Sequence, residues 1–420
     1  MTQNQIEGQD EVQGSLAFQS ERYHYMDNIR ALAMLGGVLF HCALSYGVLV
    51  QELWPVVDPK RSWWVDAFLW FSHCFRMPLF FIVAGFFAHL LMQRYGPKRF
   101  LSNRLKRLAL PFIVFWPLVA FMTIVAIGCI AYFTSLSSPL LDMIRLSIQG
   151  KEAAPAQQGI STMHFWFLYY LVIFSVLAFL FHLALLKLQA LTARSTLASA
   201  FVAGSKKALA NDRVQLLILL IVFPLLLALF RIKQVVPFQP PYGLTIELWA
   251  IGYFGAFYAL GWVLYAQKTL LYLFERPACL LVVAALILYF PFFSLLPEPY
   301  LFETSLKSGF STVTITWQQF ILVLCSALIA CYMSYACLVL AKRFLDTSNS
   351  LMRYWSDASY WIYLVHIPLL YPINAYLAGF DIPLILKLVV SVTMVMVFSL
   401  GFYALMVRRS FIGALLNGKR

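Results

Sequence analysis

Long apolar runs alternate with short polar stretches along almost the whole chain. Ten of these runs are long enough to cross a bilayer as a helix, which takes about 20 mainly apolar residues. We place them at 29–50, 66–92, 108–133, 164–186, 214–230, 244–265, 278–296, 318–341, 360–379 and 383–407. The pattern predicts an all-α fold, a polytopic integral membrane helix bundle of about ten transmembrane helices.

Composition supports a membrane protein rather than a soluble domain. Hydrophobic residues make up 62% of the 420 positions, charged residues only 12%, and the mean hydropathy is +0.78. The first twenty residues are polar and acidic and lack the basic and apolar segments of a cleaved signal peptide. We expect a disordered cytoplasmic tail over 1–22, a single transmembrane domain over 23–410 and a cytoplasmic C-terminal tail over 411–420.

Lysine and arginine gather in two loops, six of them in 93–107 and five between Lys187 and Arg213. Basic loops stay on the cytoplasmic side, so both termini are predicted to be cytoplasmic. The net charge of +13 indicates attraction to anionic membrane lipid. It does not predict a nucleic-acid partner, because the chain has no basic face interleaved with stacking aromatic residues. All seven cysteines lie in apolar runs, and none forms a CxxC pair: Cys42, Cys74, Cys129, Cys279, Cys325, Cys331 and Cys337. We therefore expect them to pack between helices and not to form a metal site.

Three polar residues mark the first span. Asp27 and Arg30 stand at its start, and His41 follows Arg30 by eleven residues within an otherwise apolar run. Eleven residues turn a helix by about 1100°, roughly 20° more than three turns, so Arg30 and His41 share one face about 16 Å apart. Such residues predict a functional site, unless the arginine only snorkels to the headgroups and the histidine only bonds to a neighbouring helix.

The second span carries His73 and Arg76 three residues apart, hence on one face at mid-depth. An arginine at that depth needs a partner other than lipid. Two interpretations stay open for Arg76. It binds backbone carbonyls freed by Pro78, or it lines the same polar cavity as His41.

Candidate residues also stand near the ends of other spans. Arg104 and Arg107 share a helix face before the third span, where they either fix topology and bind lipid headgroups or form a cytoplasmic phosphate site. His164 and Trp166 open the fourth span on the outer side, a position that also suits an ordinary aromatic belt. Glu247 is the single carboxylate of the sixth span and starts near the outer surface.

The ninth span begins with Tyr360, Tyr363 and His366 at steps of three residues. On a helix these three side chains stay within about 120° of one another. A second intramembrane histidine with two phenols on its face favours a shared polar site over isolated packing roles.

Together these residues resemble the membrane acyltransferase-3 family. Asp27, Arg30 and His41 are similar to the first-helix signature of that family, D-x-x-R, then ten residues, then H. The run FRMPLFFIVAG resembles its second-helix element, with Ala84 where serine is common. RLKRLALP, HFWFL and SYWIYLVH resemble later landmarks in the same order, so the resemblance covers about 23–375.

The resemblance implies O-acyl transfer from cytoplasmic acyl-CoA, a substrate rather than a tightly bound cofactor, to a periplasmic or cell-surface glycan. It also implies a multi-pass protein of the bacterial inner membrane. HFWFL and YFGAFYALGW are similar to the branch associated with succinylation of osmoregulated periplasmic glucans. O-acetylation of another polysaccharide stays open, as does transport of a glycan or metabolite, although the chain shows no paired repeats.

Acyl transfer to a hydroxyl needs a base and positive charge or donors for the oxyanion. His41 is the expected base, Arg76 or Arg30 would hold the thioester carbonyl or CoA phosphates, and Asp27 would orient Arg30. His366 with Tyr363 is expected to orient either the acceptor sugar or His41 itself. CoA binding is expected of Arg104, Arg107 and Arg76. Glycan binding is expected of His164, Trp166, Glu247 and Tyr360.

The charge of the acyl group matters because a succinyl group carries a free carboxylate. Burying that charge without a partner costs several kcal/mol, so a succinyltransferase needs a cation or hydroxyl donors beyond those used by the thioester chemistry. Arg76 with His73, and Tyr360 with Tyr363, are the intramembrane candidates. An acetyl donor would need none of them.

Overall fold

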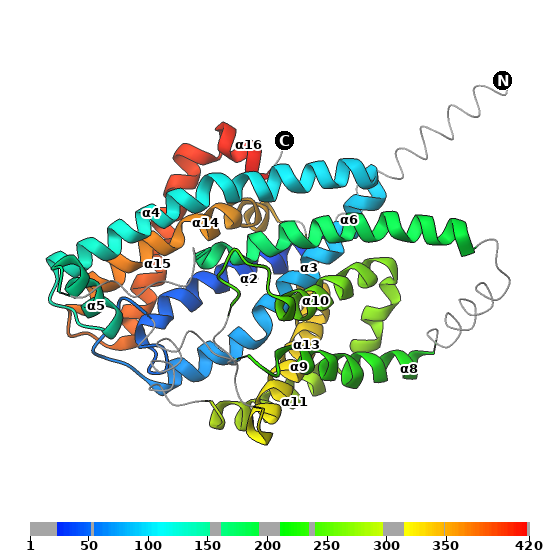
Figure 1. The fold of residues 1–420 in the computed structure, drawn as a ribbon, viewed down its shortest axis with the longest axis horizontal. Helices are drawn as coiled ribbons and strands as arrows, with labels where there is room; N and C mark the ends of the chain where they lie inside the picture. Colours follow the sequence, from blue (N-terminus) through cyan, green and yellow to red (C-terminus); the bar gives the residue numbers. More distant parts are fainter. Residues whose placement is uncertain are drawn as a thin grey trace.

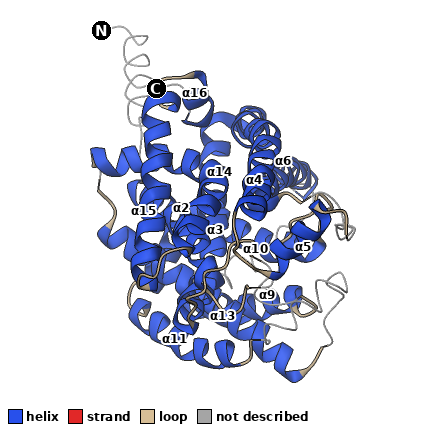
Figure 2. Cartoon of the chain, turned by 90° about the vertical axis from the view of Figure 1, so that its left-hand side faces the viewer, coloured by secondary structure: helices blue, strands red, loops and turns tan. Residues whose placement is uncertain are grey.

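The computed structural model describes residues 23–51, 54–151, 161–192, 211–234, 240–296, 315–347 and 349–417. Within these ranges every regular element is a helix or a helical turn, as Figure 2 shows. In chain order (Figure 1) they are α2 His24–Ala43, η1 Leu44–Tyr46, α3 Trp63–Arg104, η2 Leu105–Ala109, α4 Leu110–Phe133, α5 Pro139–Ile148, η3 Met163–Phe165, α6 Trp166–Thr192, α8 Asp212–Leu217, η4 Ile218–Val222, α9 Phe223–Arg231, α10 Leu248–Ala266, η5 Lys268–Phe274, α11 Ala278–Ser294, α13 Trp317–Phe344, α14 Ser350–Ala378, α15 Leu384–Phe402, η6 Tyr403–Val407 and α16 Phe411–Asn417.

The apolar runs form the membrane-spanning helices. By length and composition, eight helices of the described residues can cross a membrane, or up to nine if η5 and α11, bent by 66°, form one broken span. The continuous stretch Trp63–Phe133 holds two of the predicted spans, separated by a corner at Gly96, whose φ of 75° and ψ of 166° are not helical. Each of the ten predicted runs thus coincides with a helix, which confirms a multi-pass helical membrane protein.

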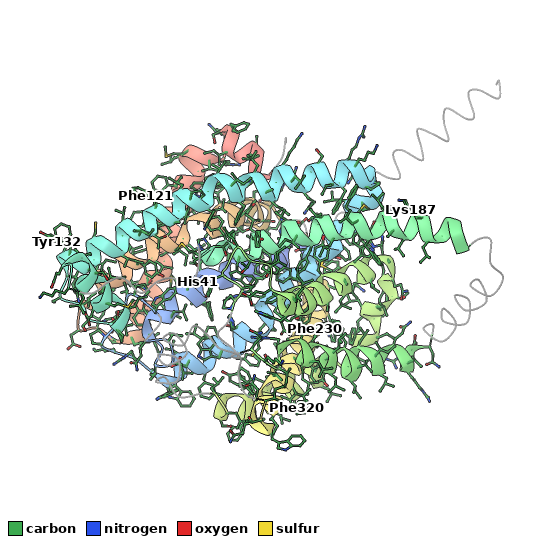
Figure 3. The ribbon with its side chains drawn as sticks, in the orientation of Figure 1. His41, Phe121, Tyr132, Lys187, Phe230 and Phe320 are labelled. Atoms are coloured by element: carbon green, nitrogen blue, oxygen red, sulfur yellow. The ribbon has the colours of Figure 1, made fainter. Side chains whose placement is uncertain are left out.

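The helices form two groups on either side of a central pair. In Figure 1, α4, α6 and α14 lie on one side, α9, α11 and α13 on the other, and α2 and α3 between them. Phe121 and Tyr132 of α4 are 65% and 73% exposed and point outward in Figure 3, as expected of lipid-facing side chains, whereas His41 lies inside. Charged residues inside the bundle are therefore screened from lipid by this apolar exterior.

Helices α3 and α10 touch backbone to backbone. A Cβ on Gly85 would lie 1.9 Å from the carbonyl oxygen of Tyr258, and one on Gly261 would lie 1.8 Å from that of Ile82. Only glycine fits at these two positions, as in the small-residue contacts that bring membrane helices together.

The first span is joined to the end of the chain. Arg30 and His41 of α2 contact Ser356 and His366 of α14, so the two residues share a face as predicted. Because the contacts advance along both helices together, α2 and α14 run parallel, the relative direction expected of first and ninth spans. The predicted tail over 1–22, residues 193–210 of the second basic loop and the last three residues lie outside the described residues, while 411–417 form α16. The cytoplasmic placement of the termini stays a prediction.

Candidate active site

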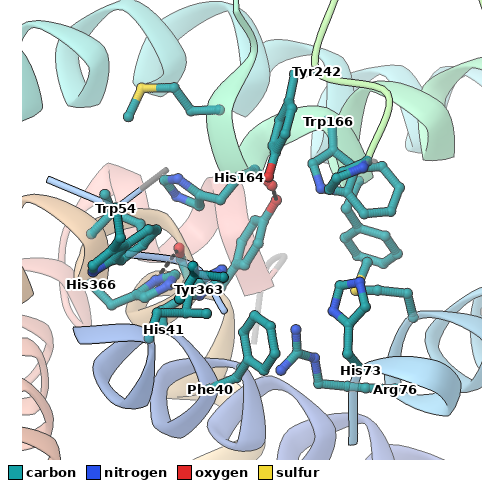
Figure 4. Close-up of a pocket in the computed structure, with 18 of the residues that line it drawn as sticks. Phe40, His41, Trp54, His73, Arg76, His164, Trp166, Tyr242, Tyr363 and His366 are labelled. Carbon is teal, nitrogen blue, oxygen red and sulfur yellow. Dashed lines mark hydrogen bonds between the residues drawn. The ribbon is translucent and has the colours of Figure 1, made fainter. Parts of the chain in front are cut away.

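A cavity of about 430 Å³ lies between α2, α3, α6 and α14 (Figure 4). Its volume falls within the usual range of small-molecule sites, roughly 300–1,000 Å³. Half of the predicted site residues line it: His41, Arg76, His164, Trp166, Tyr363 and His366. The interpretation in which Arg76 and His41 share one polar cavity is therefore confirmed.

Two imidazoles form the centre of this cavity. Nδ1 of His41 lies 2.9 Å from Nε2 of His366. Nδ1 of His366 faces the carbonyl oxygens of Ile362 at 3.2 Å and Tyr363 at 2.8 Å, and must donate to them because carbonyls only accept. In a neutral pair Nε2 of His366 is then the acceptor and His41 donates from Nδ1.

This tautomer leaves Nε2 of His41 without a proton. Among the described residues no side chain or backbone group bonds to that nitrogen. The indole of Trp54 lies parallel to the His41 ring, with centroids 6.3 Å apart and an interplanar angle of 6°. His41 is thus an oriented imidazole, and the lone pair on its Nε2 is available to a substrate in the cavity.

A loop residue, Trp54, is held over His41 by a buried network. Its Nε1 donates to Ser45 Oγ at 3.2 Å, and Ser45 Oγ also accepts from Asn374 Nδ2 at 2.8 Å. The same loop is tied to α15 by a buried ion pair between Asp58 and Lys387, with Nζ and Oδ2 2.6 Å apart. These contacts hold the wall of the site that the loop forms.

Arg76 supplies the positive charge of the cavity. Its side chain is 7% exposed, donates to the Gly36 carbonyl oxygen at 3.4 Å and places its guanidinium carbon 4.1 Å from the Phe40 ring centroid. Its backbone-carbonyl partner is on α2, not at the carbonyl freed by Pro78 on its own helix. In the described part of the chain no carboxylate lies within 4.0 Å of it. His73 stacks on the same Phe40 ring at 5.1 Å. Because no carboxylate neutralises it, the guanidinium of Arg76 can stabilise a developing oxyanion.

A third histidine, His164, lines the cavity next to the imidazole pair, with its ring centroid 5.1 Å from that of His366. Pro368 lacks an N–H, which leaves the Leu364 carbonyl of α14 without its helical donor. Nε2 of His164 fills that place at 3.3 Å, while Tyr363 donates its hydroxyl proton to the His164 carbonyl oxygen at 2.8 Å. The preceding residue, Met163, has a φ of 52°, the only positive φ of a non-glycine residue in the described ranges. Strain of this kind gathers at functional sites.

The other predicted residues lie outside the cavity. Asp27 and Arg30 form an ion pair at 3.3 Å, and Arg30 Nη2 also donates to Ser356 Oγ at 3.2 Å. Tyr360, although on the same helix as Tyr363, donates instead to the Arg107 carbonyl oxygen at 2.9 Å. Glu247 accepts a short hydrogen bond from Trp249 and does not line the cavity.

Arg30, Arg104 and Arg107 form a second polar cluster, which we call the arginine cluster. Arg104 lies within electrostatic range of both other arginines and of Tyr258. The Nε atom of Arg104 and the hydroxyl of Tyr258 are buried without a hydrogen-bond partner. Helix geometry places this cluster about 16 Å from His41 along α2. It is therefore a separate site at the end of the bundle predicted to be cytoplasmic.

Sequence reasoning missed several cavity residues. Trp54 and Tyr242 come from loops, and His73 was connected only with its neighbour Arg76. The sequence offered one signal for Trp54, its place beside Pro55 in a short loop between two predicted spans. In the described residues no group of three or more His, Cys, Asp or Glu has a geometry that could hold a metal ion.

Fold and site together define a class: a multi-pass helical membrane protein with an oriented imidazole and a buried cation in one intramembrane cavity. A family model described as an acyltransferase domain matches residues 23–404. The chain therefore belongs to the acyltransferase-3 family of membrane acyltransferases, which confirms the resemblance of its motifs.

Curated relatives match a shorter part of the chain. It is similar to proteins named glucans biosynthesis protein C from Salmonella paratyphi B, Salmonella heidelberg and Salmonella schwarzengrund. In each case 32% of 157 residues are identical, covering 37% of this chain and 38% of the relative. The alignment thus spans well under half the length of these relatives. No solved structure matches the chain.

Proposed function

We propose that the protein is an O-acyltransferase of the bacterial inner membrane that moves a succinyl group from cytoplasmic acyl-CoA to hydroxyls of a periplasmic glucan. The observation that carries the proposal is the pair His41–His366 beside Arg76 in one buried cavity. Family membership supports acyl transfer, and the name of the curated relatives supports a glucan acceptor. The donor, the acyl group and the residue roles are our inferences.

In this mechanism Nε2 of His41 takes the proton from the sugar hydroxyl as its oxygen attacks the thioester carbonyl carbon. The guanidinium of Arg76 stabilises the oxyanion of the tetrahedral intermediate. Collapse breaks the carbon–sulfur bond, and the proton passes from His41 to the leaving thiolate of CoA. His366 stabilises the imidazolium by accepting from Nδ1 throughout, which keeps the ring in one orientation.

The donor would enter from the arginine cluster. Arginine forks match phosphate oxygens in geometry and charge, and two buried polar groups there lack partners. The pantetheine arm of CoA would then run along α2 toward His41. The acceptor would reach the same cavity from the outer side, where His164 and Tyr242 line the wall.

Mass spectrometry of periplasmic glycans tests this proposal in a strain that lacks the gene and is complemented with variants. We expect a succinyl mass increment with the unchanged protein, and loss of at least about 10²-fold in product with His41→Ala, because a positioned base contributes about 10² to 10⁴ in rate. His89→Ala is the matched control, since His89 is also within a span but stacks on Trp262 outside the cavity.

Three results would contradict the proposal. Near-normal product from His41→Ala at equal membrane levels would remove the base assignment. An acetyl increment would replace the succinyl assignment and leave acyl transfer standing. Unchanged glycan masses together with altered solute uptake would favour a transporter.

A further inference from the structure

A small side pocket of about 20 Å³ adjoins the cavity. The two spaces share the wall residues His73, Met77, Trp166 and Pro240. Beyond them the side pocket is lined by residues that the mechanism above does not use, among them Arg231, Tyr253 and Ser326. It is large enough for a small terminal group and far too small for a sugar ring.

Arg231 ends α9 and is buried in this pocket, with 9% of its surface exposed. Its guanidinium carbon lies 5.0 Å from the ring centroid of Tyr253 and 5.8 Å from that of Trp249. Within the described ranges it has no carboxylate at ion-pair distance, and its Nε is buried without a hydrogen-bond partner. Aromatic faces stabilise such a cation only in part.

The position of Arg231 is fixed by its neighbours. Nε2 of Gln319 on α13 donates to the carbonyl oxygens of Ile232 at 3.2 Å and Gln234 at 2.8 Å, which secures the end of α9. The Tyr253 side chain hydrogen-bonds to Arg231 but brings no opposite charge, so the cost of removing this cation from water is not offset by a counter-charge. The arrangement fits a site whose anion arrives with a ligand.

The two buried arginines line different parts of this space, Arg76 the cavity and Arg231 the small pocket. Arg76 lies beside Phe40 in the cavity that holds His41, where the thioester carbonyl must sit for the reaction. Arg231 lines the adjoining small pocket, whose volume suits the far end of a short acyl chain and no larger group. A dicarboxylic acyl group presents its charge at that end, whereas an acetyl group has nothing to place there.

We propose that Arg231 binds the free carboxylate of a dicarboxylic acyl group and so selects succinyl over acetyl donors. The inference rests on the proposed acyl transfer, which would stand without it for an uncharged acyl group. It assigns the extra cation required by a succinyl donor to Arg231 rather than to Arg76 with His73 or to the two tyrosines of α14.

The test compares kcat/KM for succinyl-CoA and acetyl-CoA in the purified full-length protein, measured by release of the CoA thiol with glucan present. In Arg231→Met the succinyl-to-acetyl ratio should fall by about 10- to 100-fold, as expected when a hydrogen bond to a charged group is lost. Arg343→Met is the matched control, because it removes an exposed cation at the end of α13 and should leave the ratio unchanged.

A second variant acts without touching the charge. Ser326 is 2% exposed in the pocket wall, and Ser326→Val would fill space needed by the carboxylate, so the ratio should fall again. An unchanged ratio in folded Arg231→Met, or in Ser326→Val if Arg231→Met does not fold, overturns the inference while the proposed function stands. Preference for acetyl-CoA in the unchanged protein overturns the succinyl assignment itself.

Discussion

Asp58 and Lys387 offer the sharpest test of how the loop wall of the site is held. Their side chains are 2% and 1% exposed, and the ammonium lies 2.6 Å from Oδ2. The other carboxylate oxygen accepts from the backbone N–H of Lys60 at 2.8 Å. Asp58→Asn keeps the shape and that backbone bond but leaves the Lys387 ammonium buried without a counter-charge.

Breaking one partner of a buried pair typically costs about 3–5 kcal/mol, because the remaining charge stays out of water. At 1.4 kcal/mol per factor of ten, the unfolded population should rise by roughly 10²- to 10³·⁵-fold. Adding Lys387→Met to Asp58→Asn removes the second charge and should restore most of this loss. The double-mutant cycle therefore isolates the charge interaction from other effects.

Unfolding in mixed micelles, titrated with a denaturing detergent and followed by tryptophan fluorescence, gives the free energies. Asp381→Asn is the matched control, since its pair with Lys60 is exposed, with 93% of the Asp381 side chain accessible. The hydrogen bond and charge of Lys60 lower the pKa of Asp381. That contribution is present above the ordinary aspartate pKa and is lost only as pH falls through the lowered value, and solvent screening keeps it small.

The reasoning fails if Asp58→Asn unfolds like the unchanged protein, or if the double variant is as unstable as the single one. Activity adds a second readout. The backbone N–H of Asp58 donates to the Ser45 carbonyl at 2.8 Å, and Ser45 holds Trp54. Acyl transfer by Asp58→Asn should therefore fall below what its folded fraction explains.

The remaining predictions concern the site and the bundle. His366→Leu removes the acceptor of His41 Nδ1 and should lower kcat per folded protein by at least about 10²-fold with little change in donor KM; unchanged kcat would remove the orienting role, and misfolding is detected separately as loss of folded protein in the membrane. Arg76→Lys keeps the charge but loses the planar fork, so full activity would argue against guanidinium geometry at the oxyanion. Neutralising Arg104 and Arg107 together should weaken CoA binding and reduce its salt dependence in equilibrium binding; unchanged affinity would leave them as topology determinants. Gly261→Ala places a methyl against a backbone carbonyl and should destabilise the protein by about 1–3 kcal/mol in the same unfolding assay, and a neutral result would show that α3 and α10 can separate.

Apolar runs made the spanning helices predictable, because a backbone in lipid must satisfy its own hydrogen bonds. The same cost made His41, Arg76 and His366 stand out, since polar groups at depth need partners. The break between the second and third spans was predicted as a loop over 93–107, but these residues are helical except for the corner at Gly96, where a glycine followed by proline is a typical break.

Spacing alone could not separate the two polar sites. Tyr360 and Tyr363 share a helix face to within about 60°, yet one contacts the arginine cluster and the other the cavity. Depth along the helix decided between them. Trp54 was not predicted because a loop has no periodicity that would place its side chains. Arg231 was not predicted because an arginine at a helix end resembles an ordinary contact with lipid headgroups.

The contacts between the first span and the last spans determine when the site can assemble during synthesis of the chain. His41 and His366 are 325 positions apart, and Asp58 and Lys387 are 329 apart. At about 5–20 residues per second the ribosome needs roughly 16 to 65 s to make the intervening chain. Throughout that interval α2 waits in the membrane without its partner helix. A message cut short anywhere before codon 366 yields a protein with the base and no partner to orient it.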